Sequence, residues 1–183
     1  MHSSKTGELP PEQFAFDPQR FLARIGELFR EHDPEPGPRE LERRRIESVQ
    51  EIYGCIFSGE FSRWDTLCWP DVELRLLGPA SIPITGTWKG LDEILAAMRR
   101  NFAWLEQQNV TPQTVVAQGD LVLVVAHEVG IYRLTGARYE LHFVQEFLFD
   151  GERVRRIRQI VDGLQLAEAI WGGVASRTKL SDA

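Results

Sequence analysis

The chain is poor in cysteine and in long hydrophobic runs, and each shortage excludes a class of protein. Its 183 residues include two cysteines, Cys55 and Cys68, which are too few for a disulfide framework or a zinc cluster. No apolar stretch reaches the roughly 20 residues that a transmembrane helix needs. The N-terminal segment MHSSKTGELPPEQ also lacks the apolar core of a secretory signal. We therefore expect a cytoplasmic protein that does not insert into a membrane.

Positive charge is also in short supply. Lys and Arg number 21 against 27 Asp and Glu, which gives a net charge of −6. Binding to nucleic acid through its phosphates requires a clustered excess of positive charge, so we expect no nucleic-acid partner. The sequence contains no H-E-x-x-H zinc motif, P-loop, G-x-S-x-G motif, or G-x-G-x-x-G after a strand. It therefore predicts no metal site and no cofactor.

Hydrophobic periodicity predicts helices in the first half of the chain. Asp17 is a suitable N-cap for a helix over residues 17–31, and Pro18 takes its first position. Residues 32–38 separate this helix from the next, so we expect it to dock on a surface that the sequence does not identify. Spacings of three and four residues predict further helices over 39–58, 60–69 and 92–107.

The second half of the chain reads as strands. They are predicted over residues 72–77, 110–118, 121–134, 137–149 and 153–161, with residues 80–87 as a loop or irregular edge and 164–171 as a final helical turn. Thr135-Gly136 and Asp150-Gly151 are strong hairpin signals. Helices followed by antiparallel strands indicate an α+β fold. We expect an N-terminal arm and docking helix over residues 1–38, one domain over 39–172, and a disordered tail over 173–183.

Four segments of the chain stand out together: SGEFSRWDTLCWPDVEL (58–74), GTWKGLDEI (86–94), TGARYELHF (135–143) and FDGERVRRIRQIVDG (149–163). In order and spacing they resemble the nuclear transport factor 2-like superfamily, and most closely its SnoaL-like branch, which is related to polyketide cyclases and ketosteroid isomerases. The resemblance covers roughly residues 40–163.

The resemblance implies a cone-shaped fold with an internal pocket. A strongly curved, mixed but mainly antiparallel sheet would wrap around three helices, with the N-terminal helix as an extra element. The pocket would take a small hydrophobic molecule, and two copies would form a homodimer through the outer face of the sheet. The superfamily includes cofactor-free acid/base enzymes of isomerase, cyclase, dehydratase and hydrolase types. It also includes non-catalytic modules for ligand binding or dimerisation, and a third interpretation is an accessory subunit of a larger enzyme.

The resemblance also selects candidate catalytic residues on two strands. Glu140 and His142 match positions that carry polar pocket residues, and Asp162 matches the aspartate that closes the last strand. His142 has an ordinary pKa of about 6.5, which suits a general base oriented by Asp162. Arg158 shares a strand face with Asp162, and pairing with it would lower the pKa of that carboxyl. The opposite face of strand 137–149 is almost wholly apolar and needs burial by a helix, by core or by a partner chain.

Further pocket residues are predicted from the helices and the central strand. Tyr53 lies near the helix position from which ketosteroid isomerases present a phenol. Trp69 and Trp88 are candidates for aromatic pocket walls. His127 and Glu128 point to opposite faces of their strand, and the family pattern favours Glu128 for the pocket while leaving His127 open.

The sequence departs from each known catalytic set of the superfamily. Leu76-Leu77-Gly78-Pro79 stands where ketosteroid isomerases have their base aspartate, and Phe57 where dehydratases have an acid. Arg158 and Asp162 supply only two members of the Asp–Arg–Asp set of epoxide hydrolases. The resemblance therefore implies a fold and a pocket, and leaves open the reaction type and whether there is catalysis at all.

Overall fold

The computed structural model of the protein describes residues 17–31, 40–80 and 82–171. The expected N-terminal arm over residues 1–16 and the expected tail over 173–183 lie outside this described part.

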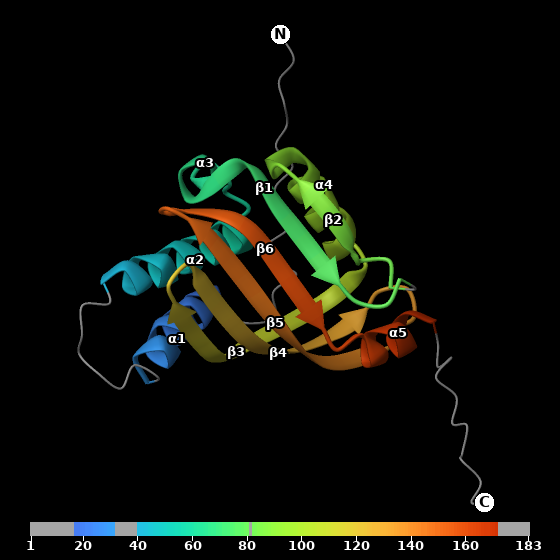
Figure 1. The fold of residues 1–183 in the computed structure, drawn as a ribbon. Helices are drawn as coiled ribbons and strands as arrows, with labels where there is room; N and C mark the ends of the chain where they lie inside the picture. Colours follow the sequence, from blue (N-terminus) through green and yellow to red (C-terminus); the bar gives the residue numbers. More distant parts are fainter. Residues whose placement is uncertain (1–16, 32–39, 81, 172–183) are drawn as a thin grey trace, which may run out of the picture.

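A six-stranded curved sheet forms the body of the molecule (Figure 1). Its strand order is β2-β1-β6-β5-β4-β3. Strand β1 runs parallel to β6, and every other neighbouring pair is antiparallel. This mixed sheet confirms the predicted α+β cone-type fold. The strands are β1 (Cys68–Leu77), β2 (Gly86–Lys89), β3 (Leu105–Gln118), β4 (Leu121–Tyr132), β5 (Arg138–Asp150) and β6 (Arg153–Val161).

The helices α2 (Glu40–Ser58), α3 (Trp64–Leu67) and α4 (Leu91–Phe102) supply the other layer of the core. In Figure 1, α2 passes behind the strands. The last helix, α5 (Gly163–Trp171), packs against β5.

The N-terminal helix α1 (Pro18–Glu31) is docked on the sheet and on α2. It contacts β3 and α2, so its docking surface, which the sequence does not identify, is formed by the chain itself. Its apolar stripe of Phe21, Ile25 and Leu28 is buried in the same hydrophobic core as the rest of the molecule.

Some element boundaries differ from the predicted ones. Helix α3 is a single turn, because β1 already begins at Cys68 rather than near residue 72. Pro70 is accommodated in β1 where the pairing with β6 shifts register, so no ladder hydrogen bond is needed from it. Helix α4 ends at Phe102, and β3 begins at Leu105 in a stretch that was predicted to continue the helix.

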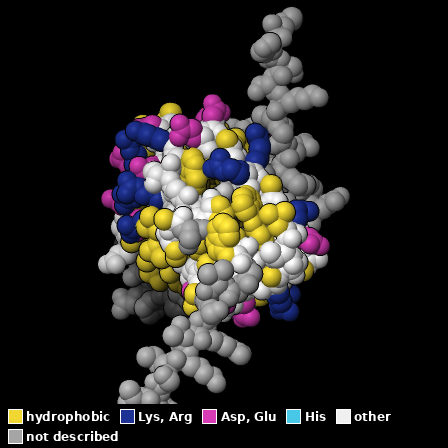
Figure 2. All heavy atoms as spheres, turned by 90° about the vertical axis from the view of Figure 1, so that its right-hand side faces the viewer, with side chains coloured by type: hydrophobic (Ala, Val, Ile, Leu, Met, Phe, Trp, Pro, Cys, Tyr) yellow, Lys and Arg dark blue, Asp and Glu magenta, His cyan; other side chains and the backbone are white. Residues whose placement is uncertain are grey.

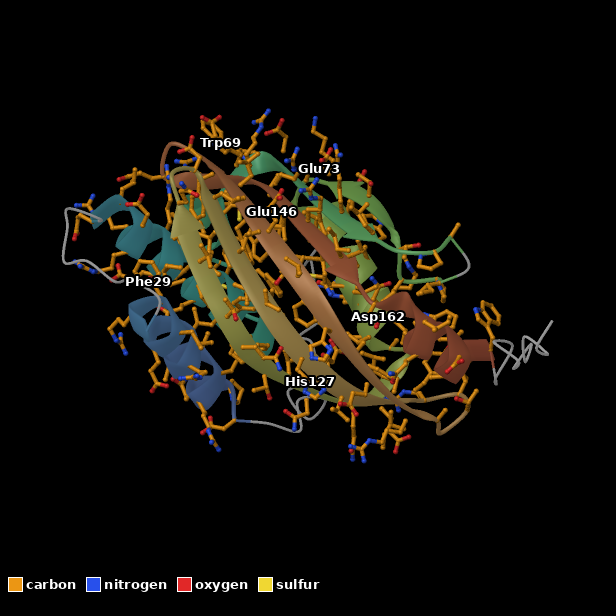
Figure 3. The ribbon with its side chains drawn as sticks, turned by 60° about the horizontal axis from the view of Figure 1, so that its bottom comes forward. Phe29, Trp69, Glu73, His127, Glu146 and Asp162 are labelled. Carbon is orange, nitrogen blue, oxygen red and sulfur yellow. The ribbon has the colours of Figure 1, made fainter. Side chains whose placement is uncertain are left out.

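The two faces of β5 have opposite environments. The apolar face is turned inward and buried within a single chain. Burial of this face by a partner chain, one of the alternatives that the sequence leaves open, is therefore wrong. Its side chains belong to the core of the single chain: Tyr139, Leu141, Phe143, Phe147 and Phe149. The outer face carries polar residues such as His142 and Glu146, and Figure 3 looks onto this side of the sheet.

Candidate functional site

A cavity of about 150 Å³ lies between the helices and the inner face of the sheet. Its wall is mostly apolar, with Ile52, Phe57, Met98 and Phe147 among the contributing side chains. Seven polar or partly polar side chains interrupt this apolar lining: Tyr53, Trp64, Asn101, Gln108, Glu128, Gln145 and Gln159. An apolar cavity with a few convergent polar groups is the usual form of a small-molecule site.

The first polar group in the cavity is a chain of three side chains that links α2 to the sheet. Tyr53 donates its hydroxyl to Oε1 of Gln145, and Nε2 of Gln145 donates to Oε1 of Gln159 at 3.3 Å. Burial raises the pKa of Tyr53, so its phenol stays protonated at neutral pH. Tyr53 therefore offers a neutral hydroxyl at the cavity wall.

The second polar group surrounds a buried carboxyl on β4. Oε1 of Glu128 accepts hydrogen bonds from Tyr139 Oη at 2.6 Å and from Gln108 Nε2 at 2.9 Å. Burial raises the pKa of Glu128 above its ordinary value, while the hydrogen bonds from Tyr139 and Gln108 act in the opposite direction. Glu128 is thus a carboxyl that holds its proton to higher pH than an exposed glutamate.

Gly130 makes the Glu128 cluster possible. It pairs with Tyr139 across β4 and β5, and a Cβ added to it would lie 2.3 Å from the Tyr139 hydroxyl oxygen. The missing side chain lets the phenol lie across the strand and reach the carboxyl two residues earlier.

Asn101 contributes an unsatisfied acceptor from the end of α4. Its Nδ2 donates to the carbonyl oxygen of Ile84 at 3.3 Å, whereas its buried Oδ1 has no hydrogen-bond partner among the described residues. Buried polar atoms are nearly always paired in native proteins. An O–H or N–H donor on a bound molecule would satisfy this oxygen.

The structure places two of the predicted pocket residues in the cavity wall, Tyr53 and Glu128. It also settles which of the two adjacent β4 side chains points inward. His127 lies on the outer face, where its Nε2 is 2.8 Å from Oε1 of Glu140. The expected placement of Glu140 in the pocket is therefore corrected, because it is an exposed partner of His127.

The predicted catalytic pair lies on the outside of the sheet. His142 and Asp162 are exposed, and neither lines the cavity. Asp162 is labelled in Figure 3, close to α5. The reason is strand alternation, since the inward positions on β5 belong to Phe143 and Gln145. Asp162 accepts a 3.4 Å hydrogen bond from the backbone N–H of Leu164 at the start of α5. A catalytic role for the pair stays a prediction, and this placement gives it no support.

The remaining predicted pocket residues also lie outside the cavity. Arg158 is on the outer face and pairs with Glu146 instead of Asp162. Trp69 donates from Nε1 to the carbonyl oxygen of Asp150 at 3.2 Å, at the turn between β5 and β6. Trp88 sits on the edge strand β2, with the Arg100 guanidinium 5.9 Å from its ring.

Sequence reasoning missed the amides of the cavity, and one of them left a signal. Gln145 is the single polar residue on the apolar face of β5, and such an isolated polar side chain in a buried face needs a partner. No comparable signal marks Gln108 on the edge strand β3, Gln159 on the charged strand β6 or Asn101 near the end of α4. Polar residues are ordinary at each of these places.

Two further features bear on the class of protein. Among the described residues, no three His, Cys, Asp or Glu side chains are grouped closely enough to hold a metal ion. Nor does any helix in the described ranges have the length and hydrophobicity to cross a membrane.

The curved sheet, the helices inside it and the cavity between them define a cone-type α+β protein. The chain belongs to the SnoaL-like domain family, whose model matches residues 49–157. Comparison with curated proteins found no match.

Solved structures of similar fold include members described as SnoaL-like. A nuclear transport factor 2-like protein from Burkholderia xenovorans LB400 is 23% identical, with a TM-score of 0.61 over 70% of this chain and 96% of its own. A proposed SnoaL-like polyketide cyclase from Jannaschia sp. CCS1 is 19% identical, with a TM-score of 0.63 over 74% and 96%. IdmH, a proposed polyketide cyclase from Streptomyces antibioticus, is 20% identical, with a TM-score of 0.55 over 69% and 98%. At these identities the likeness concerns the fold alone.

Proposed function

We propose that the protein binds a small, largely apolar molecule in the cavity and exchanges a proton with it at Glu128. The observation that carries the proposal is a buried carboxyl in the wall of an otherwise apolar cavity. Carboxyls with a raised pKa in such cavities act as general acids or bases near neutral pH. This corresponds to cofactor-free chemistry of the isomerase, cyclase, dehydratase or hydrolase type.

The surroundings of Glu128 suit proton transfer in both directions. In the acid direction its O–H bond breaks, the proton passes to a ligand oxygen, and the electron pair stays on the carboxylate. The hydrogen bonds from Tyr139 and Gln108 then stabilise that carboxylate. In the base direction the carboxylate takes a proton from carbon beside a carbonyl, and the electron pair moves to the carbonyl oxygen. To donate to that oxygen, the neutral hydroxyl of Tyr53 exchanges its hydrogen bond to Oε1 of Gln145 for one to the ligand.

Hydrogen–deuterium exchange tests this proposal without a known substrate. Cyclohexanone incubated with the protein in heavy water is expected to gain deuterium beside its carbonyl faster than with buffer alone. Glu128→Gln keeps an amide of similar shape but no acid, and is expected to lose the acceleration. Mass spectrometry measures the deuterium content.

Matched variants on the outer face make the experiment decisive. Glu146→Gln removes a carboxyl that faces away from the cavity and is expected to retain the exchange rate. His142→Gln tests the sequence-based candidate in the same assay. Exchange that survives Glu128→Gln contradicts the proposed role, and exchange lost in His142→Gln assigns the proton transfer to the outer face. Binding of cyclohexanone without any exchange indicates a non-catalytic binding protein.

We also propose that two copies associate through the outer face of the sheet. Four apolar residues pair in one row across four strands on this face: Val125, Val144, Ile160 and Leu77. Ile160 and Leu77 are 49% and 40% exposed, which is high for side chains of their size. A symmetric second copy of the chain would cover this row.

A further inference from the structure

Helix α1 lies outside the region that matches the SnoaL-like domain family, which begins at residue 49. It nevertheless belongs to the core, because it packs against β3 and α2 (Figure 1). One of its side chains, Phe21, reaches the cavity and forms part of its wall. The ligand site is therefore built partly by an element that the family match does not include.

Phe21 is held by aromatic contacts beside the polar chain of the cavity. Its ring centroid is 5.0 Å from those of both Tyr53 and Phe57 on α2, with edge-to-face geometry at each. Such pairs add to the stabilisation from burial alone, so the ring has a defined position. Phe21 is also almost fully buried, with 3% of its surface exposed.

Phe21 also separates the cavity from the outside. A groove runs between α1 and β3, rimmed by Arg20, Arg24 and Glu27 among others. Phe21 and Val110 line this groove and line the cavity as well. These two side chains are thus a common wall, with the cavity on one side and the open groove on the other.

We propose that Phe21 is a specificity-determining residue that limits the cavity to ligands of one ring and closes it toward the groove. This inference rests on the proposed function, because it assumes that the cavity is the ligand site. A cavity of about 150 Å³ accommodates a single benzene-sized ring. Removing the Phe21 ring both enlarges the cavity and joins it to the groove, so a two-ring ligand gains room.

A gain of binding tests the role of Phe21. Phe21→Ala is expected to bind 1-tetralone, a two-ring ketone, at least about tenfold more tightly than the unaltered protein does. Phe29→Ala is the matched control, because Phe29 is a buried phenylalanine of the same helix that lines neither the cavity nor the groove (Figure 3). It loses as large a side chain and is expected to leave 1-tetralone affinity unchanged. NMR titration measures both affinities and shows whether each variant is folded.

Each outcome bears on Phe21 separately from the proposed function. A folded Phe21→Ala that binds 1-tetralone no better than the unaltered protein overturns the inference, and so does an equal gain in Phe29→Ala. If Phe21→Ala does not fold, Phe21→Leu is expected to show a smaller gain, and its absence overturns the inference equally. Failure of the unaltered protein to bind cyclohexanone counts against the proposed function alone, since 1-tetralone binding by the variant still decides the role of Phe21.

Discussion

Glu128 is the one acidic side chain among the described residues that line the cavity, and its buried environment has a measurable thermodynamic consequence. Burial raises its pKa in the folded protein above the ordinary value of 4.5, which the unfolded chain keeps. Between these two values the folded state binds more protons than the unfolded state. The free energy of unfolding therefore falls as the pH rises from about 4.5 through the folded pKa.

Glu128→Gln should remove this loss of stability. Its neutral amide still offers an oxygen to Tyr139 and Gln108, and it does not ionise. Relative to the unaltered protein, the variant should gain about 1.4 kcal/mol for each pH unit inside the window. Urea unfolding followed by tryptophan fluorescence from pH 4 to 8 measures the difference. Parallel pH profiles for the two proteins would contradict the raised pKa.

At the scale of single residues, the sequence predicts types of side chain better than their direction. Strand alternation shows that Glu128 and His127 point to opposite faces of the sheet, but it does not show which of them points inward. The resemblance to the superfamily was needed to favour Glu128. His142 was placed in the pocket by the same resemblance, against the apolar character of the opposite face of β5. That apolar face, interrupted by Gln145, was the physical indication of the inside.

At the scale of elements, Arg45 joins a helix to two turns of the sheet. This α2 side chain is only 4% exposed, and it donates to the carbonyl oxygens of Gly119 and Gly151 and to the Asp120 carboxylate. Its guanidinium also lies 5.3 Å from the centre of the Phe149 ring. One side chain therefore fixes the β3–β4 and β5–β6 turns against α2.

Arg45→Met should destabilise the protein while keeping most of the apolar stem. Two carbonyl oxygens in part-buried hydrogen bonds lose their donor, which costs on the order of 2–3 kcal/mol of unfolding free energy. Asp120→Asn is the control, and because the Asp120 side chain is 68% exposed, it should cost less than about 1 kcal/mol. Urea denaturation measures both values. Equal losses in the two variants would assign the stabilisation to the exposed ion pair instead.

Elements with strong periodicity or turn signals were predicted well, and those that depend on tertiary pairing were not. The hairpins at Thr135-Gly136 and Asp150-Gly151 form where their turn residues predict them. Strand β2 and the early start of β1 escaped prediction, since both are stabilised by pairing with distant segments. The docking of α1 also depends on surfaces made by other elements.

At the scale of the whole molecule, exposed apolar side chains gather at one end. Leu164 and Trp171 of α5 are exposed there, and Figure 2 shows the hydrophobic surface on the side that bears this helix. Ile160, the next-to-last residue of β6, lies three residues before the start of α5 in the chain. This surface adjoins the apolar row proposed as the interface between two copies.

Ile160→Lys should convert a dimer into a monomer, because it places a charge in the middle of the apolar row. Leu41→Lys is the control, since Leu41 is a comparably exposed apolar residue on α2, away from the sheet. Analytical ultracentrifugation should give half the mass for Ile160→Lys and an unchanged mass for Leu41→Lys. A monomeric unaltered protein, or a dimer that survives Ile160→Lys, would refute the interface.

The position of β6 between β1 and β5 also governs how the protein is made. Neither the β1–β2 pair nor the β3–β5 meander encloses the cavity before the last strand joins them. Cavity residues run from Phe21 to Gln159, so nearly the whole described chain must leave the ribosome before the site exists. Ligand binding can therefore stabilise the folded state by mass action only after the cavity residues have been synthesised. Until then, the aromatic face of β5 must be kept from aggregating by something other than the ligand.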